Sequence, residues 1–335
     1  MAQYSLVAVA QQSLSSDAYV LDLRRTTAGL AATVSDQRLT LLDPQRLRPL
    51  NSWATAQGNL KAVALMGASL CTAGEDGSVA VWDLRLAGER ARVGGFQASA
   101  SPILALACSE GTQTIAVGTE LHAHTASILL WDVRAGPVTR AHYQEVHSDD
   151  VTTLAYHPSS PDLLISGSTD GLVNILDTRV ADEDEVTLQT LNHDASIHHA
   201  GFVSNDVVFA LSHDERFSLY DGVALDPQDD SITTTIPFGD VRSLLDCRYV
   251  ADVTPKTDGT GVVLGAGSQE RQSFELVFLT RDAVESSWKL DRANGVALPG
   301  AHGDEIVRAF CFFDEEQLVF TAGEDGNVKA WRPNG

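Results

Sequence analysis

Three side chains near the C-terminus have the types that nucleophilic catalysis requires. His302, Thr321 and Asp325 supply an imidazole, a hydroxyl and a carboxylate, which in a hydrolase triad act as base, nucleophile and orienting group. However, His147 and Asp170 repeat the pattern, and both histidine–aspartate pairs are separated by 23 residues. Because a catalytic centre does not usually recur at a structural period, we interpret these residues as parts of a repeated fold. We predict no enzymatic activity.

Other motifs that carry chemistry are missing or incomplete. The chain contains no G-x-x-x-x-G-K-[ST], G-x-G-x-x-G or G-x-S-x-G sequence, so phosphate loops, dinucleotide sites and nucleophile elbows are not indicated. His122 and His124 offer two possible metal ligands, fewer than a tetrahedral site needs. His198 and His199 are adjacent on an expected strand, where consecutive side chains point to opposite faces. We therefore predict neither a cofactor nor a metal site.

The elements that carry the polar residues form an internal repeat. The hexapeptide Thr-Ala-Gly-Glu-Asp-Gly occurs at residues 72–77 and again at 321–326, each time between two short apolar runs. Related strand–turn–strand units begin near residues 31, 115, 165, 209 and 262, which makes seven units with these two. Aspartates that close five units, at 43, 83, 132, 177 and 221, recur every 40 to 49 residues. This period is typical of a four-stranded β-propeller blade.

Further strands complete each unit. A strand is expected before most pairs, at residues 60–65, 103–108, 151–156, 197–202, 244–249 and 306–312, and a weaker fourth strand after each closing aspartate. The last unit ends without room for its fourth strand, whereas a β-like run at about residues 4–11 precedes the first unit. We predict an all-β, seven-bladed β-propeller that forms a single domain over residues 1–335, with the N-terminal strand closing the seventh blade and the ring. The sixth blade has the least defined register.

Composition limits the partners and the compartment. The chain has 45 acidic and 23 basic residues and a net charge of −22, which disfavours direct binding of nucleic acid. Four cysteines lie scattered in apolar runs, which predicts buried free thiols and a reducing compartment. Neither a signal peptide nor a membrane span is indicated at the N-terminus. We expect a cytoplasmic and/or nuclear protein with no membrane association.

These repeats resemble the WD-repeat β-propeller family. Trp82-Asp83 and Trp131-Asp132 match the dipeptide for which the family is named. The resemblance implies a seven-bladed platform for protein interactions. It also implies that the recurring polar residues form buried hydrogen-bond networks, which consist of His147, Ser166 and Asp170 in one unit and His302, Thr321, Asp325 and Trp331 in the last.

Acidic residues are a further functional signal. In this topology the loop before each first strand and the turn after each second strand share one face. Two interpretations are open: an acidic surface that keeps the protein dispersed, or a docking face that captures a Lys/Arg-rich segment through its focused potential. The carboxylates expected on this face are Glu75, Asp149, Asp150, Asp194, Asp214, Glu215, Asp304, Glu305 and Glu324.

A second signal lies on the opposite face. Arg85 and Arg134 end two W-D-x-R boxes, and Arg179 ends a near copy. In the family that the chain resembles, such a box can mark propellers that dock onto the adaptor of a cullin-type ubiquitin ligase. The other interpretation is a solvated arginine in a polar turn.

Together these features predict a non-catalytic interaction scaffold. We expect its acidic face to bind a basic protein segment in an escort, chaperone or assembly role, for example in ribosome biogenesis with a ribosomal protein, or with a histone. The alternative is a substrate receptor of a cullin-type ubiquitin ligase that uses the W-D-x-R boxes. We expect the chain to be a monomer by itself.

Overall fold

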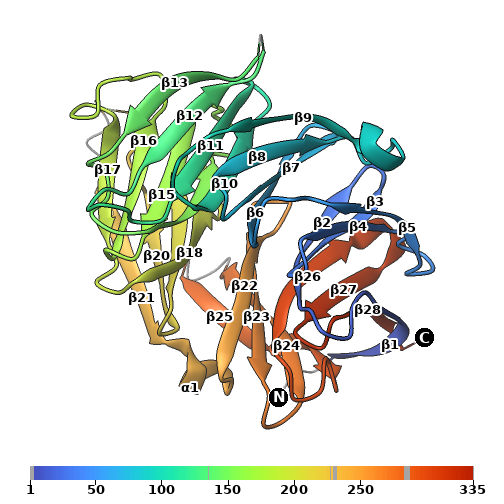
Figure 1. Ribbon diagram of the computed structural model, residues 1–335. Helices are drawn as coiled ribbons and strands as arrows, with labels where there is room; N and C mark the ends of the chain where they lie inside the picture. The colour runs from blue at the N-terminus through green and yellow to red at the C-terminus, as the bar shows by residue number, and fades with distance from the viewer. Residues whose placement is uncertain (1–3, 135, 227, 229–231, 283–286, 335) are drawn as a thin grey trace. The chain divides into compact units, whose positions relative to one another are not determined.

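The computed structural model describes residues 4–134, 136–226, 228, 232–282 and 287–334, and most of them lie in β-strands (Figure 1). The chain divides into two compact units. The first contains residues 1–56, 84–91 and 241–335, and the second contains residues 57–83 and 92–240. A single domain over residues 1–335 stays a prediction.

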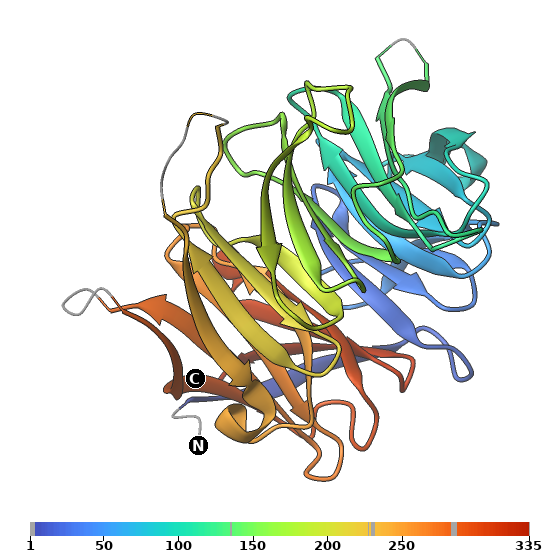
Figure 2. The same ribbon diagram turned by 90° about the vertical axis from the view of Figure 1, so that its left-hand side faces the viewer.

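The second unit consists of four antiparallel sheets of four strands, each in the order of the sequence. Figure 2 shows the green and yellow sheets of this unit following one another. The first sheet contains β6 (Leu60–Met66), β7 (Ser69–Gly74), β8 (Ser78–Trp82) and β9 (Arg92–Gln97). The next contains β10 (Ile103–Ser109), β11 (Thr114–Thr119), β12 (Ile128–Asp132) and β13 (Val138–Tyr143). The other two contain β14 (Val151–Tyr156), β15 (Leu163–Ser168), β16 (Leu172–Asp177) and β17 (Thr187–Asn192), and β18 (Ile197–Phe202), β19 (Val207–Ser212), β20 (Arg216–Asp221) and β21 (Thr234–Asp240).

The first unit contains one four-stranded sheet and one eight-stranded sheet. The smaller sheet contains β2 (Val20–Thr26), β3 (Gly29–Val34), β4 (Arg38–Leu42) and β5 (Pro49–Ala54), and the short 3-10 helix η1 (Gly88–Ala91) contacts β5. Half of the larger sheet contains β22 (Tyr249–Pro255), β23 (Gly261–Ser268), β24 (Ser273–Arg281) and β25 (Trp288–Pro299). The other half contains β26 (Val307–Phe313), η2 (Asp314–Glu316) beyond its end, β27 (Leu318–Gly323), β28 (Asn327–Pro333) and β1 (Tyr4–Ser13).

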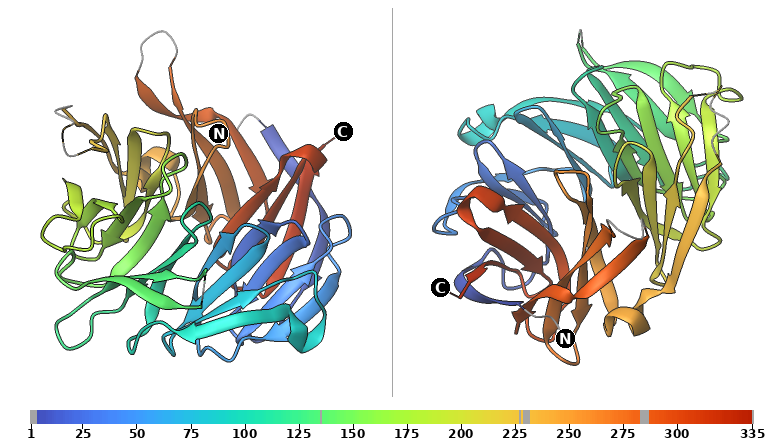
Figure 3. Two further views of the ribbon diagram at one scale, coloured as in Figure 1. Left: turned by 90° about the horizontal axis from the view of Figure 1, so that it is seen from above. Right: turned by 180° about the vertical axis from the view of Figure 1, so that it is seen from behind.

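The N-terminal strand completes the last group of strands, as predicted. β1 pairs antiparallel with β28, from Leu6 opposite Pro333 to Ser13 opposite Asn327. Figure 3 shows the blue N-terminal strand beside the red C-terminal strands. A second pairing was not predicted: Tyr4 and Ser5 pair in parallel with β25, which joins the two halves of the eight-stranded sheet. The seven four-strand groups among the described residues agree with a β-propeller, and the fold class is confirmed.

The sixth unit differs from the prediction at its first strand. The apolar run at 244–249 is not a strand, because Val241–Leu245 forms the helix α1. One of its leucines, Leu245, is buried, whereas Leu244 is 53% exposed, which suits one turn of a helix. The inner strand is β22, where Val250 and Val253 are buried across a register shift. Without the family's polar residues, hydrophobic periodicity alone placed this strand too early.

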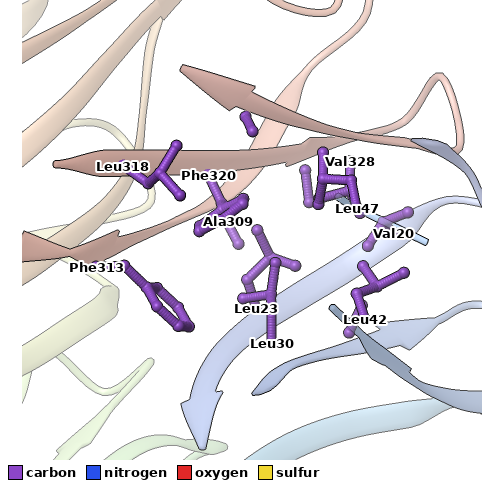
Figure 4. Packing of buried hydrophobic residues seen from close by; sticks show 13 residues of the cluster. Val20, Leu23, Leu30, Leu42, Leu47, Ala309, Phe313, Leu318, Phe320 and Val328 are labelled. Carbon is purple, nitrogen blue, oxygen red and sulfur yellow. The ribbon is translucent and has the colours of Figure 1, made fainter. Parts of the chain in front are cut away.

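The core lies between neighbouring sheets of one unit. In Figure 4, Leu23 and Leu30 of the small sheet face Phe313 and Phe320 of the last strand group. The second strands β11 and β15 are buried at every position because neighbouring sheets of the second compact unit cover both of their faces. β3 and β19 are buried at every position as well. Phe320 is fully buried, so truncating it to alanine should cost about 3–5 kcal/mol.

The repeated hexapeptide is a tight turn with a glycine requirement. Gly77 and Gly326 have φ of 75° and 71°, in the left-handed region that glycine adopts without strain. A Cβ on Gly326 would lie 2.1 Å from the carbonyl oxygen of Ser15, and a Cβ on Gly77 would lie 2.2 Å from that of Ser99. Because both close approaches are to backbone, neither position accepts a larger residue. The repetition of the hexapeptide therefore reflects the geometry of the turn.

Among the described residues, no helix is long and apolar enough to span a membrane. None of the four cysteines, all of which lie in the described part of the chain, forms a disulfide. Cys71 and Cys247 are buried as predicted, whereas Cys108 and Cys311 are partly exposed. Burial raises the pKa of the Cys311 thiol to about 11, so this side chain is a weak nucleophile at neutral pH.

Candidate functional site

The polar residues of the fourth unit form a hydrogen-bond network. Nδ1 of His147 lies 3.0 Å from Oδ2 of Asp170, and Nε2 lies 2.9 Å from the hydroxyl of Ser166. The imidazole is fully buried, and the Asp170 carboxylate also accepts the backbone N–H of Ser148. The network joins the loop before β14 to the β15–β16 turn. The His147 imidazole has no exposed surface.

The last unit contains the same arrangement with a tryptophan added. Nδ1 of His302 lies 2.6 Å from Oδ1 of Asp325, and Nε2 lies 2.8 Å from the hydroxyl of Thr321. The indole N–H of Trp331 donates to the same hydroxyl at 2.9 Å. One oxygen of Thr321 thus connects two strands and the loop before β26. The arrangement can hold a turn in place, and it leaves the hydroxyl no freedom to attack a substrate.

A third network was not found from the sequence because its histidine is replaced. In the second sequence repeat, Gln57 accepts a hydrogen bond from the hydroxyl of Thr72 at 2.5 Å. The indole N–H of Trp82 donates to the same hydroxyl at 2.8 Å. Gln57 precedes its hydroxyl by 15 residues, whereas both histidines precede theirs by 19. The shorter spacing and the different residue type both hid the match. Trp82 and Thr72 were the residues from which this network could have been predicted.

The third unit retains its tryptophan without a partner for it. Trp131 lies opposite Ile115, as Trp82 lies opposite Leu70, so Val117 occupies the position of the missing hydroxyl. The buried indole N–H of Trp131 has no hydrogen-bond partner, and its ring packs against Phe96 with centroids 4.9 Å apart.

Both network aspartates have lowered pKa values. Burial by itself would raise the pKa of Asp170 and Asp325, but hydrogen bonds from the two histidines and from nearby donors outweigh it. Their carboxylates are therefore ionised at neutral pH and contribute to stability there. These charges belong to the fold and are not free to bind a ligand.

In the second compact unit, hydrogen bonds fix several carboxylates that were predicted for the acidic face. They lie at the same edge of their sheets. Glu75, in the β7–β8 turn, accepts the side-chain amide of Asn59, in the loop before β6, at 2.9 Å. Asp150, in the loop before β14, accepts the backbone N–H of Leu121 from the β11–β12 turn at 2.7 Å. Asp149 accepts the N–H of Asp150 at 2.9 Å. Loops before first strands and turns after second strands are thus in contact.

The fifth sequence repeat contributes three more of the carboxylates that were predicted for the acidic face. Asp194 is exposed and has a φ of 58°, and its N–H donates to Asn192. Asp214 forms an ion pair with Arg216 at 3.1 Å and accepts the hydroxyl of Ser212. Glu215 lies beside them in the β19–β20 turn, with a φ of 63°. Asp214 is therefore partly neutralised, whereas Asp194 is not ion-paired with any described lysine or arginine.

In the first compact unit, one residue that was predicted to contact a partner already forms an ion pair within the chain. Asp304 and Glu305 are exposed in the loop before β26. Glu324 was expected to be exposed, but its side chain is only 15% exposed and forms an ion pair with Arg308. The Arg308 guanidinium also lies over the ring of Tyr19, 5.9 Å from its centroid. A register shift between Val307 and Ala309 places Arg308 in a bulge beside the β27–β28 turn, which the sequence did not indicate.

The W-D-x-R boxes form local ion pairs. Arg134 binds the carboxylate of Asp132, and Arg179 binds that of Asp177 at 2.6 Å. The arginine side chains are 64% and 65% exposed. Hydrogen bonds from Arg134 lower the pKa of Asp132 to about 2, so the pair stays ionised at any physiological pH. Arg85, which ends the other W-D-x-R box, is exposed as well.

Among the residues that the structure describes, no group of three or more histidine, cysteine, aspartate or glutamate side chains could hold a metal ion. One expectation about the histidines is wrong. His198 and His199 do not point to opposite faces, because their ring centroids are 4.0 Å apart. The register shift between Ile197 and His199 interrupts the alternation of the strand.

Similar proteins carry the same repeats. The family model described as WD domain, G-beta repeat matches residues 139–177 and 296–332. An uncharacterized WD repeat-containing protein of Saccharomyces cerevisiae is 32% identical over 99% of this chain and 82% of its own length. Another from Schizosaccharomyces pombe is 28% identical over 96% of this chain and 97% of its own length. The WD repeat-containing protein 89 homolog of Dictyostelium discoideum is 24% identical over 94% of this chain and 83% of its own length.

Proposed function

The chain belongs to the family of WD repeat-containing proteins, and from this premise we propose that it is a non-catalytic scaffold whose acidic loops bind a basic segment of a partner protein. WD repeat domains generally mediate protein–protein interactions. The specific role that we propose is that of an escort or assembly factor, which shields a Lys/Arg-rich segment such as that of a ribosomal protein or a histone. It would act in the cytoplasm, the nucleus or both.

One observation carries the proposal. Four of the predicted carboxylates belong to loops and turns of three sheets in the second compact unit. None of the four forms an ion pair with a described lysine or arginine. They are Glu75, Asp149, Asp150 and Asp194. Hydrogen bonds fix the carboxylates of Glu75, Asp149 and Asp150 to their loops. Fixed anionic groups lose little conformational entropy on binding a cation. They therefore suit a partner that brings several positive charges.

The charge of the whole chain supports the same partner. At a net charge of −22, the protein attracts cations from a distance and accelerates their association. Exposed ion pairs contribute only about 0.2–1 kcal/mol each, so a useful affinity needs several of them on one segment. A Lys/Arg-rich segment meets this requirement. A single lysine does not.

Charge neutralisation at the loops tests the proposal. The triple variant Glu75→Gln, Asp149→Asn and Asp194→Asn removes three negative charges and keeps the hydrogen-bond acceptors. A matched control, Asp182→Asn with Asp184→Asn and Glu185→Gln, removes the same charge from exposed residues in the β16–β17 loop. We expect the first variant to weaken binding of a fluorescent Lys/Arg-rich peptide by about tenfold at low salt, and the control to weaken it much less.

Equal losses in the two triple variants would show that only the total charge matters, which would contradict a defined docking surface. The salt dependence provides a second reading. Binding through several ion pairs should weaken steeply between low and physiological ionic strength. An affinity that is independent of salt would also contradict the proposal.

A second candidate function rests on the W-D-x-R boxes. Arg134 and Arg179 share one geometry, since each binds the aspartate two residues before it and remains largely exposed. A common geometry on neighbouring sheets would suit docking onto the adaptor of a cullin-type ubiquitin ligase. Replacing Arg85 and Arg134 by alanine should then abolish co-purification with that adaptor. Unchanged recovery would eliminate this candidate.

A further inference from the structure

The N-terminal strand β1 has an unusual sequence for the edge of a sheet. Its residues, Tyr-Ser-Leu-Val-Ala-Val-Ala-Gln-Gln-Ser, include neither a charged residue nor a proline. Across the whole chain, 20% of the residues are Asp, Glu, Lys or Arg. Sheet edges are normally protected against further pairing by lysines, prolines, other charges or bulges, and of these β1 has only the register shift between Ala8 and Ala10.

One edge of β1 is mostly open. From Leu6 to Ser13 the strand pairs with β28 on one side, with a register shift between Ala8 and Ala10 that leaves Val9 without a partner residue in β28. On the other side it pairs with β25 only at Tyr4 and Ser5, and no described strand continues that pairing. Because β25 ends at Pro299, it cannot extend along β1. The short parallel contact shows that this edge accepts a strand, and on this side Leu6–Ser13, about four two-residue repeats of the pleat, is left unpaired.

The open part of β1 also exposes apolar side chains. Val7 and Val9 are 37% and 51% exposed, and Tyr4 at the start of the strand is 55% exposed. Outer strands elsewhere carry protective residues: Pro49 in β5, Arg92 in β9, Arg140 in β13, and Pro237 and Asp240 in β21. β17 is uncharged too, but none of its leucines is exposed. Within the described part of the chain, β1 alone combines an uncharged sequence with exposed valines.

We propose that β1 is a docking edge to which a partner protein adds an extended segment as a further strand, with alternating apolar and basic side chains. In such strand addition the backbone supplies affinity and alternate side chains supply specificity. Apolar side chains of the added strand would cover Val7 and Val9. The occupant is a different protein and not a second copy, because two chains of net charge −22 repel each other. A basic segment is attracted by the same charge.

This inference involves residues other than the acidic loops and does not rest on the function proposed above. Its test uses two defined peptides, an alternating Lys-Val octapeptide and a Lys-Pro octapeptide of equal length and charge. Only the first can form a strand, since proline has no N–H to donate and fixes φ away from a regular ladder. Binding is measured by fluorescence anisotropy at physiological ionic strength. We expect the Lys-Val peptide to bind and the Lys-Pro peptide to bind at least about tenfold more weakly.

Matched variants locate the site. Val7→Lys with Val9→Lys places charges on the β1 edge, and Val93→Lys with Val138→Lys places the same charges on the outer strands β9 and β13, at residues that are 54% and 61% exposed. We expect the β1 variant to weaken Lys-Val binding by at least about tenfold relative to the β9/β13 variant. Slower hydrogen exchange of the Val7–Ser13 amides on peptide binding gives a readout that needs no substitution.

Three results would overturn the proposal. Equal binding of the two peptides would show attraction by charge without strand formation. Equal loss in the two double variants would place the peptide away from β1. A wild-type dimer that the β1 variant converts to a monomer would identify the occupant as a second copy. Loss of Lys-Pro binding in the Glu75, Asp149 and Asp194 variant would concern the acidic loops alone, so the two proposals can fail separately.

Discussion

Replacing Thr321 by valine removes one oxygen and leaves a side chain of nearly the same shape. That oxygen accepts the indole N–H of Trp331 at 2.9 Å and lies 2.8 Å from Nε2 of His302. When the imidazole is neutral and donates its Nδ1 hydrogen to Asp325, the Thr321 hydroxyl donates to Nε2. The substitution therefore leaves one donor and one acceptor without partners.

The magnitude follows from the burial of these groups. Thr321 is fully buried, Trp331 is 2% exposed and His302 is 3% exposed, so water cannot replace the lost hydrogen bonds. An unsatisfied buried polar group costs about 1–3 kcal/mol, which gives about 2–6 kcal/mol for two such groups. This loss is a large part of the 5–15 kcal/mol that is typical of a folded protein. Thr321→Val should therefore unfold at a distinctly lower urea concentration.

The third unit supplies a control within the same chain. Val117 occupies the position of the missing hydroxyl beside the unpartnered indole of Trp131. Val117→Thr makes the opposite change at an equally buried position and should alter the free energy of unfolding by less than about 1 kcal/mol. Urea unfolding followed by circular dichroism measures both variants. A Thr321→Val protein that unfolds within about 0.5 kcal/mol of wild type would refute the network argument.

Three further outcomes are expected. Asp170 and Asp325 have folded-state pKa values below the unfolded value of 3.8, so the stability they contribute is present above that pH and is lost as the pH falls through the folded values. The double variant with asparagine at both sites should show a flatter loss of stability in acid titrations. Arg308→Ala releases Glu324 from its ion pair and should tighten binding of a Lys-rich peptide about threefold, as measured by anisotropy; weaker binding would count against the acidic loops. Deletion of residues 1–13 exposes the edge of β28 and should lower the melting midpoint and cause aggregation in size-exclusion chromatography, whereas a monomeric, equally stable product would contradict the closing role of β1.

Much of the fold could be predicted because its signals are local and repeated. The repeated turn requires glycine at its last position, which is Gly77 in one copy and Gly326 in the other. The apolar runs that precede the turns have the length of strands. The N-terminal strand was predicted from a deficit of one strand in the last unit. The predicted first strand of the sixth sequence repeat was wrong because Leu244 and Leu245 fit a short apolar strand as well as a helical turn.

The candidate site was less predictable, since it depends on which charges meet in space. Glu324 belongs to the repeated hexapeptide and was predicted to contact a partner, but a bulge in β26 brings Arg308 to it. Gln57 replaces a histidine at a different spacing and was recognisable only from its hydrogen bond to Thr72. Bulges and loop lengths change side-chain direction without changing the periodicity that sequence reasoning uses.

The sequence by itself determined the repeat, its period and the residues that hold each turn, because hydrogen-bonded turns and glycine conformations are local constraints. Only the tertiary structure decided which of the acidic side chains are neutralised, that β1 also contacts β25, and that the remaining edge of β1 is open. The two pairings of β1 join segments about 290 residues apart or more, as for Tyr4 with Val296. No pattern within a single repeat specifies such a pairing.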